Sequence, residues 1–115
     1  MNLDELAARL RAFARERDWE QFHAPKNLAM ALAVEAAELM EHFQWLTERQ
    51  SGELTPAAKE KAAAELADVF IYTVRLADRL GVDLGAAVEA KIVVNAAKYP
   101  VEKSRGSAKK YSELE

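Results

Sequence analysis

Apolar residues recur along this chain at intervals of three and four, the spacing at which side chains share one face of an α-helix. Stretches of this kind cover residues 3–17, 26–47, 56–80 and 84–98. No stretch alternates apolar with polar residues as a half-buried strand would. Alanine, leucine, glutamate, lysine and arginine, which favour helices, dominate the composition. The pattern therefore predicts an all-α protein.

Local signals mark where several of these helices begin and end. Asn2 is a suitable N-cap for the first helix, and Thr55 followed by Pro56 marks the start of the third, because proline is favoured at the first helical position. Gly81 is expected to close that helix in the left-handed conformation. Asp83 is the predicted N-cap of the last helix. Residues 18–27 and 48–54 are predicted to be connections, the second a turn.

Two of the predicted helices each carry a pair of carboxylates three residues apart within a largely apolar run. Glu35 and Glu38 form one pair, and Glu65 and Asp68 form the other. Residues three apart are neighbours on a helix surface, so like charges there repel unless something neutralises them. On a helical wheel Glu35 falls within the leucine stripe, where an unpaired carboxylate is costly to bury. Either a metal ion or a structural ion pair would resolve this charge.

Four carboxylates from two helices suit a hard cation such as Mg²⁺, which commonly links protein carboxylates to substrate phosphates. A di-iron site is disfavoured, since it needs Glu-x-x-His pairs from two helices, and none of Glu35, Glu38 and Glu65 is followed three residues later by histidine. Cysteine is absent, as are the Gly-x-Ser-x-Gly elbow and the Walker phosphate loop. These residues indicate metal-assisted hydrolysis of a phosphoryl group, with water as nucleophile and a carboxylate taking the proton.

One face of the last predicted helix carries Lys91, Asn95 and Lys98, at positions i, i+4 and i+7. Two ammonium groups and an amide are suited to binding phosphate oxygens. An ordinary solvated face would have the same composition, so both interpretations stay open on the residues alone.

The connection over residues 18–27 contains Trp19, Phe22 and His23 within a short distance of one another. The cluster would serve as an apolar plug over the end of the helices. It would equally form a wall on which a flat ligand such as a nucleobase stacks, because aromatic faces accept every base.

Residues 66–74 are apolar on nearly every side, and Asp68 is the one charge among them. A helix that is apolar all round is surrounded by protein. In so short a chain we expect part of that cover to come from a second subunit, most simply in a two-fold dimer. A non-catalytic helical oligomerisation module, with its carboxylates in structural ion pairs, is the alternative to an enzyme.

The net charge of −3 disfavours a dedicated nucleic-acid binder, which usually carries a basic stripe. No secretory leader is recognisable, and the apolar runs are too short for a membrane span. We therefore expect a soluble cytoplasmic protein with no nucleic-acid or membrane partner. A single domain is predicted over residues 1–100, followed by a polar tail over 101–115.

Taken in order, the motifs resemble those of the MazG-like all-α nucleotide pyrophosphohydrolases. The resemblance lies in the Glu-x-x-Glu and Glu-x-x-Asp pairs described above and in the run Lys91-x-x-x-Asn95-x-x-Lys98-Tyr99-Pro100. Residues 17–23, 43–45, 105–107 and 110–111 are similar to the dCTP pyrophosphatase branch of that family. The resemblance extends over nearly the whole chain.

The resemblance implies a four-helix bundle assembled as a homodimer or homotetramer. It also implies Mg²⁺-dependent hydrolysis of a nucleoside triphosphate, dCTP or a modified pyrimidine analogue, to the monophosphate and pyrophosphate, with Mn²⁺ able to replace Mg²⁺. It makes the two acidic pairs metal ligands or water-positioning groups. The further residues that it assigns are Lys91, Asn95 and Lys98 to the phosphates and Trp19, His23, Trp45 and Tyr72 to the base and sugar.

Overall fold

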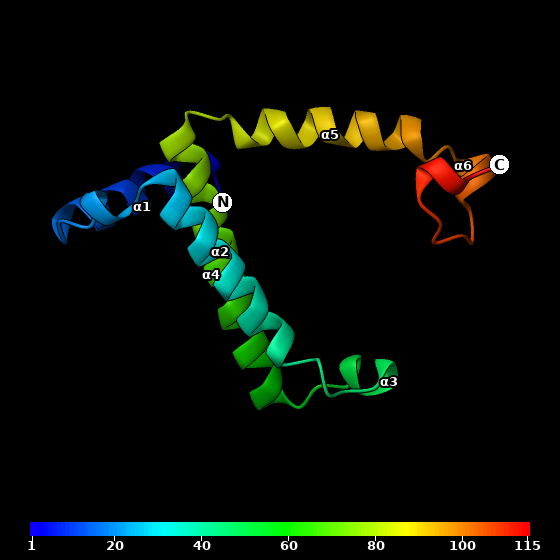
Figure 1. The fold of residues 1–115 in the computed structure, drawn as a ribbon. Coiled ribbons are helices and arrows are strands. Elements are labelled where there is room, and N and C mark those ends of the chain that lie inside the picture. The colour runs from blue at the N-terminus through cyan, green and yellow to red at the C-terminus, as the bar shows by residue number, and fades with distance from the viewer. The chain divides into compact units, whose positions relative to one another are not determined.

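The computed structural model describes residues 1–115, and all its regular elements are helices, which confirms the predicted all-α class (Figure 1). The chain divides into two compact units, residues 1–82 and 83–115. The prediction of a single domain over 1–100 stays a prediction. The helices are α1 (Leu3–Glu16), α2 (Pro25–Glu41), α3 (Glu48–Ser51), α4 (Pro56–Leu80), α5 (Leu84–Lys98) and α6 (Val101–Ser104), with 3₁₀ turns η1 (Glu20–Phe22) and η2 (Tyr111–Glu113).

The four long helices occur where the apolar pattern predicts them, but α3 and α6 raise the number to six, so the count of four is not confirmed. The second helix was expected to reach Thr47 and instead ends at Glu41. Thr47 adopts an extended conformation, and its side chain caps α3 by accepting a hydrogen bond from the Gln50 amide. An N-cap residue is non-helical by definition, so this short helix excludes continuation of α2 through Thr47.

The predicted caps are present. The Asn2 side chain accepts a hydrogen bond from the Glu5 amide, and the side chains of Thr55 and Asp83 cap α4 and α5 in the same way. Gly81 closes α4 with φ 69°, a conformation that an L side chain disfavours. Local chemistry therefore sets most of the helix boundaries.

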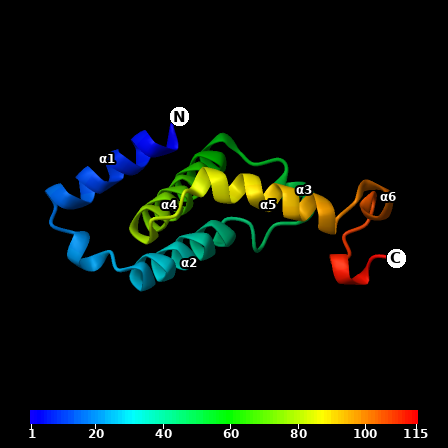
Figure 2. The same cartoon turned by 90° about the horizontal axis from the view of Figure 1, so that it is seen from above.

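In the first unit α2 and α4 lie side by side and antiparallel, and α1 packs against α4 (Figures 1 and 2). The core is small and consists of buried leucine, valine and alanine side chains: Leu6, Ala14, Leu28, Ala62, Val74 and Ala77. The antiparallel arrangement brings the start of α2 beside the end of α4. It also brings the carboxylates of α2 opposite those in the first half of α4.

Large apolar side chains remain uncovered in both units. On α4 the exposed fractions of Leu66 and Phe70 are 56 % and 42 %, and on α5 Ile92 and Val93 are also exposed. The segment that is apolar on nearly every side is thus only partly covered by its own chain. No helix combines the length and the apolar character that crossing a membrane requires.

Candidate functional site

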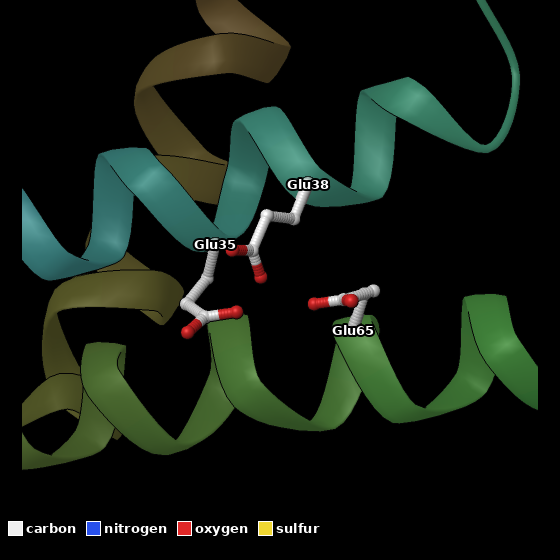
Figure 3. Close-up of side chains that lie close together, drawn as sticks. All are labelled: Glu35, Glu38 and Glu65. Atoms are coloured by element: carbon white, nitrogen blue, oxygen red, sulfur yellow. The ribbon is translucent and has the colours of Figure 1, made fainter.

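Three carboxyl groups converge between α2 and α4 (Figure 3). Glu35 and Glu38 point from α2 toward α4, and Glu65 points from α4 into the same space. One oxygen of each group lies within 4.8 Å of the others, and all three residues are half-buried. The trio, as we call these three glutamates, is the candidate metal centre.

The trio carries more negative charge than its surroundings compensate. Burial raises the pKa of Glu35 to about 7, with further contributions from hydrogen bonding to Glu38 and Glu65 and from the charges of Glu38 and Asp68. One oxygen of Glu35 and one of Glu65 are buried without a hydrogen-bond partner. No lysine or arginine forms an ion pair with the trio.

These observations match what a divalent cation would require of the protein. The donor atoms are all carboxylate oxygens, which hard cations prefer. Two of them are buried and unpartnered, and such groups are rare in proteins unless something else satisfies them. Neither lysine nor arginine forms the structural ion pairs at the trio that the non-catalytic alternative requires.

Asp68, the fourth predicted acid, lies one turn further along α4 and is exposed. It stands outside the trio, although its charge raises the pKa of Glu35. The structure therefore brings together three of the four predicted carboxylates.

His42, which the sequence analysis did not single out, lies beside the trio. Its Nε2 is 3.7 Å from an oxygen of Glu65. It also borders a cavity of about 330 Å³ whose other lining residues are Leu46, Gln50, Glu53, Leu54, Thr55 and Ala58. His42 follows Glu38 by four residues and Glu35 by seven, so the helical period could have indicated that it shares their face.

Of the residues expected to bind the base and sugar, the structure brings Trp19 and His23 together. Their ring centroids are 6.4 Å apart, and Trp19 also packs edge-on against Phe13 at 5.8 Å. Tyr72 is half-buried on α4. Trp45 follows α2, is 86 % exposed and makes no aromatic contact within the chain.

His23 belongs to a second polar cluster, where α1 and the connection before α2 meet the last turns of α4. Arg75 donates its Nε–H to His23 Nδ1 at 3.2 Å and an Nη1–H to Asp78 at 3.1 Å. Arg11 on α1 binds Asp78 with two hydrogen bonds, the shorter of 2.6 Å. Because Arg11 hydrogen-bonds this carboxylate, the pKa of Asp78 is lowered, while burial acts in the opposite direction.

The residues expected to contact phosphate lie on α5, in the second unit. Lys91 and Asn95 are exposed. Lys98 is half-buried, with its Nζ 4.7 Å from the centroid of the Tyr111 ring. The tail, which was expected to be polar, thus provides an aromatic neighbour for one of the residues expected to contact phosphate.

The sequence matches one family model and several curated relatives. The model of the MazG-like family matches residues 30–114. The chain is 53 % identical to dCTP pyrophosphatase 1 of Rattus norvegicus and 50 % identical to that of Homo sapiens, over 104 residues in each case. These matches cover 89 % of this chain and 61 % of each relative, so the chain spans about three-fifths of their length.

Among solved structures, the fold is similar to a pyrophosphatase from Archaeoglobus fulgidus. The TM-score is 0.80 at 39 % sequence identity, and the match covers 84 % of this chain and 91 % of the other. The relatives found by sequence and the solved structure found by fold are all pyrophosphatases.

Proposed function

We propose, because the chain belongs to the MazG-like family, that it hydrolyses a nucleoside triphosphate to the monophosphate and pyrophosphate. The proposed substrate is dCTP or a modified pyrimidine analogue, since relatives at 50–53 % identity are dCTP pyrophosphatases. The observation that carries the proposal is the convergence of Glu35, Glu38 and Glu65 without a lysine or arginine partner.

The trio, joined by Asp68 from the next turn of α4, would hold Mg²⁺, with Mn²⁺ as a substitute. When bound there, the cation would polarise the phosphoryl group and offset the charge of the phosphate oxygens. The protein itself must first release a proton from Glu35. Because the pKa of Glu35 is about 7, the free trio retains a proton near neutral pH that must leave before all three oxygens can serve as ligands.

A carboxylate oxygen of the trio that does not bind the cation accepts the proton of the attacking water. The half-buried position of these groups limits competing hydrogen bonds from solvent. We assign the phosphate contacts to Lys91, Asn95 and Lys98, because ammonium and amide groups are suited to phosphate oxygens.

We assign the base and sugar to Trp19, His23, Trp45 and Tyr72. Support comes from the contact between the Trp19 and His23 rings and from the large exposed indole of Trp45. Stacking on an aromatic side chain contributes on the order of 1–3 kcal/mol per base.

We assign the active form to a homodimer or homotetramer. Exposed Leu66 and Phe70 on α4 are too apolar for a solvated surface, and α5 has a comparable apolar surface. Extended apolar patches on a soluble protein usually mark interaction sites. A second subunit would cover these side chains and bring further residues to the nucleotide.

The test is pyrophosphate release from a panel of deoxynucleoside triphosphates, with and without Mg²⁺. Glu38→Gln should abolish release, because it removes one charged oxygen ligand from the trio. Glu41→Gln is the matched control, since Glu41 lies on the same helix but is exposed and outside the trio. Release without Mg²⁺, or equal loss in both variants, would contradict the proposal.

Calorimetry separates an enzyme from a non-catalytic oligomerisation module. An enzyme should bind Mg²⁺ more tightly when a nucleotide is present, because phosphate oxygens complete the coordination of the cation. A structural module should bind it equally with and without nucleotide.

A further inference from the structure

The imidazole of His23 is held through one of its two nitrogens. Arg75 donates its Nε–H to Nδ1, and Arg79 donates its Nε–H to the His23 carbonyl oxygen at 3.1 Å. A guanidinium can only donate hydrogen bonds, so Nδ1 must accept. In a neutral imidazole one nitrogen accepts and the other carries the proton. The contact with Arg75 therefore places the proton on Nε2.

Arg75 is itself fixed in place. Its exposed fraction is 3 %, and its Nη1 is bound to Asp78, which Arg11 holds from α1. The guanidinium has little freedom to release Nδ1, because it is buried and Asp78 binds it from the next turn of the same helix. The tautomer of His23 is thus determined by Arg75, which lies 52 positions away in sequence.

Burial and the charges that face His23 both favour the neutral form of its ring. Burial lowers the pKa of His23 below its usual 6.5, and the positive charges of Arg75 and Arg79 lower it further, while Glu20 acts in the opposite direction. At pH 7 the ring therefore has one donor and one acceptor, and Arg75 already uses the acceptor.

Stability alone does not account for Arg75. Its Nη2 is buried without a hydrogen-bond partner, and a buried donor left unpaired costs free energy. An apolar side chain at this position would avoid that cost. Arg75 provides what an apolar side chain could not, a hydrogen bond to Nδ1 that determines which nitrogen of His23 carries the proton.

We propose that Arg75 is a positioning residue that holds His23 as the Nε2–H tautomer, so that the imidazole presents a hydrogen-bond donor to the nucleotide. This inference rests on the proposed function, which places His23 in the nucleotide site. Nε2 makes no hydrogen bond within the chain, and His23 is only half-buried. We place this donor against N3 of the base, where it suits cytosine, whose N3 is an acceptor, and disfavours thymine, whose N3 carries a proton.

The first test is ¹⁵N nuclear magnetic resonance of the imidazole nitrogens at pH 7.5. The chain has two histidines, and His42→Asn assigns the signals. In the unmodified protein Nε2 of His23 should be protonated and Nδ1 unprotonated, whereas Arg75→Met should give a mixture of the two tautomers. A protonated Nδ1 in the unmodified protein, or the same His23 signals in Arg75→Met, would overturn the proposal.

Arg11→Gln is the matched control for a purely structural role. It removes the ion pair between α1 and Asp78 and leaves the contact between Arg75 and His23. Its melting temperature should fall, and its His23 tautomer should stay as in the unmodified protein. If Arg11→Gln alters the tautomer as much as Arg75→Met does, general loosening explains the effect and the proposal fails.

The second test connects the tautomer to the nucleotide. Arg75→Met should lower the ratio of kcat/KM for dCTP to that for dTTP by about tenfold, mainly through KM. An unchanged ratio would overturn the proposal. Addition of dCMP should shift the Nε2 signal of the unmodified protein. If no triphosphate is hydrolysed, the proposed function fails, and the response of Nε2 to dCMP still decides whether His23 serves a nucleotide.

Discussion

The raised pKa of Glu35 makes a quantitative prediction about the metal-free protein. The pKa rises from 4.5 to about 7, and each pKa unit corresponds to about 1.4 kcal/mol, so the full effect is about 3 kcal/mol. Because the folded protein binds this proton more tightly than the unfolded chain, the stabilisation is complete below pH 4.5. It is lost as the pH rises through about 7. Partial exposure of the trio makes 3 kcal/mol an upper limit.

Glu35→Gln removes the titrating group and keeps the size of the side chain. At pH 5 the variant and the unmodified protein should have similar melting temperatures in the presence of EDTA. At pH 8 the variant should melt higher by up to about 10 °C, because a domain of this size gains roughly 4 °C for each kcal/mol. Excess Mg²⁺ should raise the melting temperature of the unmodified protein at pH 8 and leave that of the variant nearly unchanged.

The measurement is thermal unfolding followed by circular dichroism between pH 5 and pH 9, with EDTA or Mg²⁺. Glu41→Gln is again the control, since its exposed carboxylate should leave the pH profile of the unmodified protein unaltered. The difference in melting temperature between Glu35→Gln and the unmodified protein should grow with pH. A difference that stays constant across this range would refute the argument that the charge of Glu35 destabilises the metal-free protein.

Two further changes test other parts of the molecule. Asp78→Asn should destabilise the protein by about 3 kcal/mol in urea unfolding at pH 7, because Arg75 and Arg11 lose their shared anion. Since the pKa of Asp78 is lowered, this stabilisation is present above about pH 4 and disappears in stronger acid; an equal loss at pH 7 and pH 2 would contradict the assignment. Leu66→Lys should reduce the mass measured by analytical ultracentrifugation, because it places a charge on the exposed apolar surface of α4. An unchanged mass would mean that α4 does not form the interface.

The sequence predicts best those features that depend on neighbouring residues. The caps at Asn2, Thr55 and Asp83 and the left-handed Gly81 are visible in the sequence because each depends on groups only a few positions away. The end of α2 was mispredicted for a related reason. The apolar period continues past Glu41, yet Thr47 and Gln50 form a capping box that begins a separate helix.

One part of the acidic site follows from local sequence, and the other part depends on how the helices pack. The proximity of Glu35 to Glu38 follows from the helical repeat alone. Glu65 joins them only because α2 and α4 pack antiparallel in one particular register, and that same register leaves Asp68 exposed and outside the trio. The raised pKa of Glu35 is likewise a consequence of packing, since burial is its largest cause.

The sequence by itself determined the helical class, most helix boundaries and the residue types that suit metal and phosphate. Only the tertiary structure decided which of those residues meet. The contact between Arg75 and His23 joins residues 52 positions apart, and no local signal records it. Hydrogen bonds within a helix repeat with a short period, whereas contacts between helices depend on how side chains pack across the whole unit.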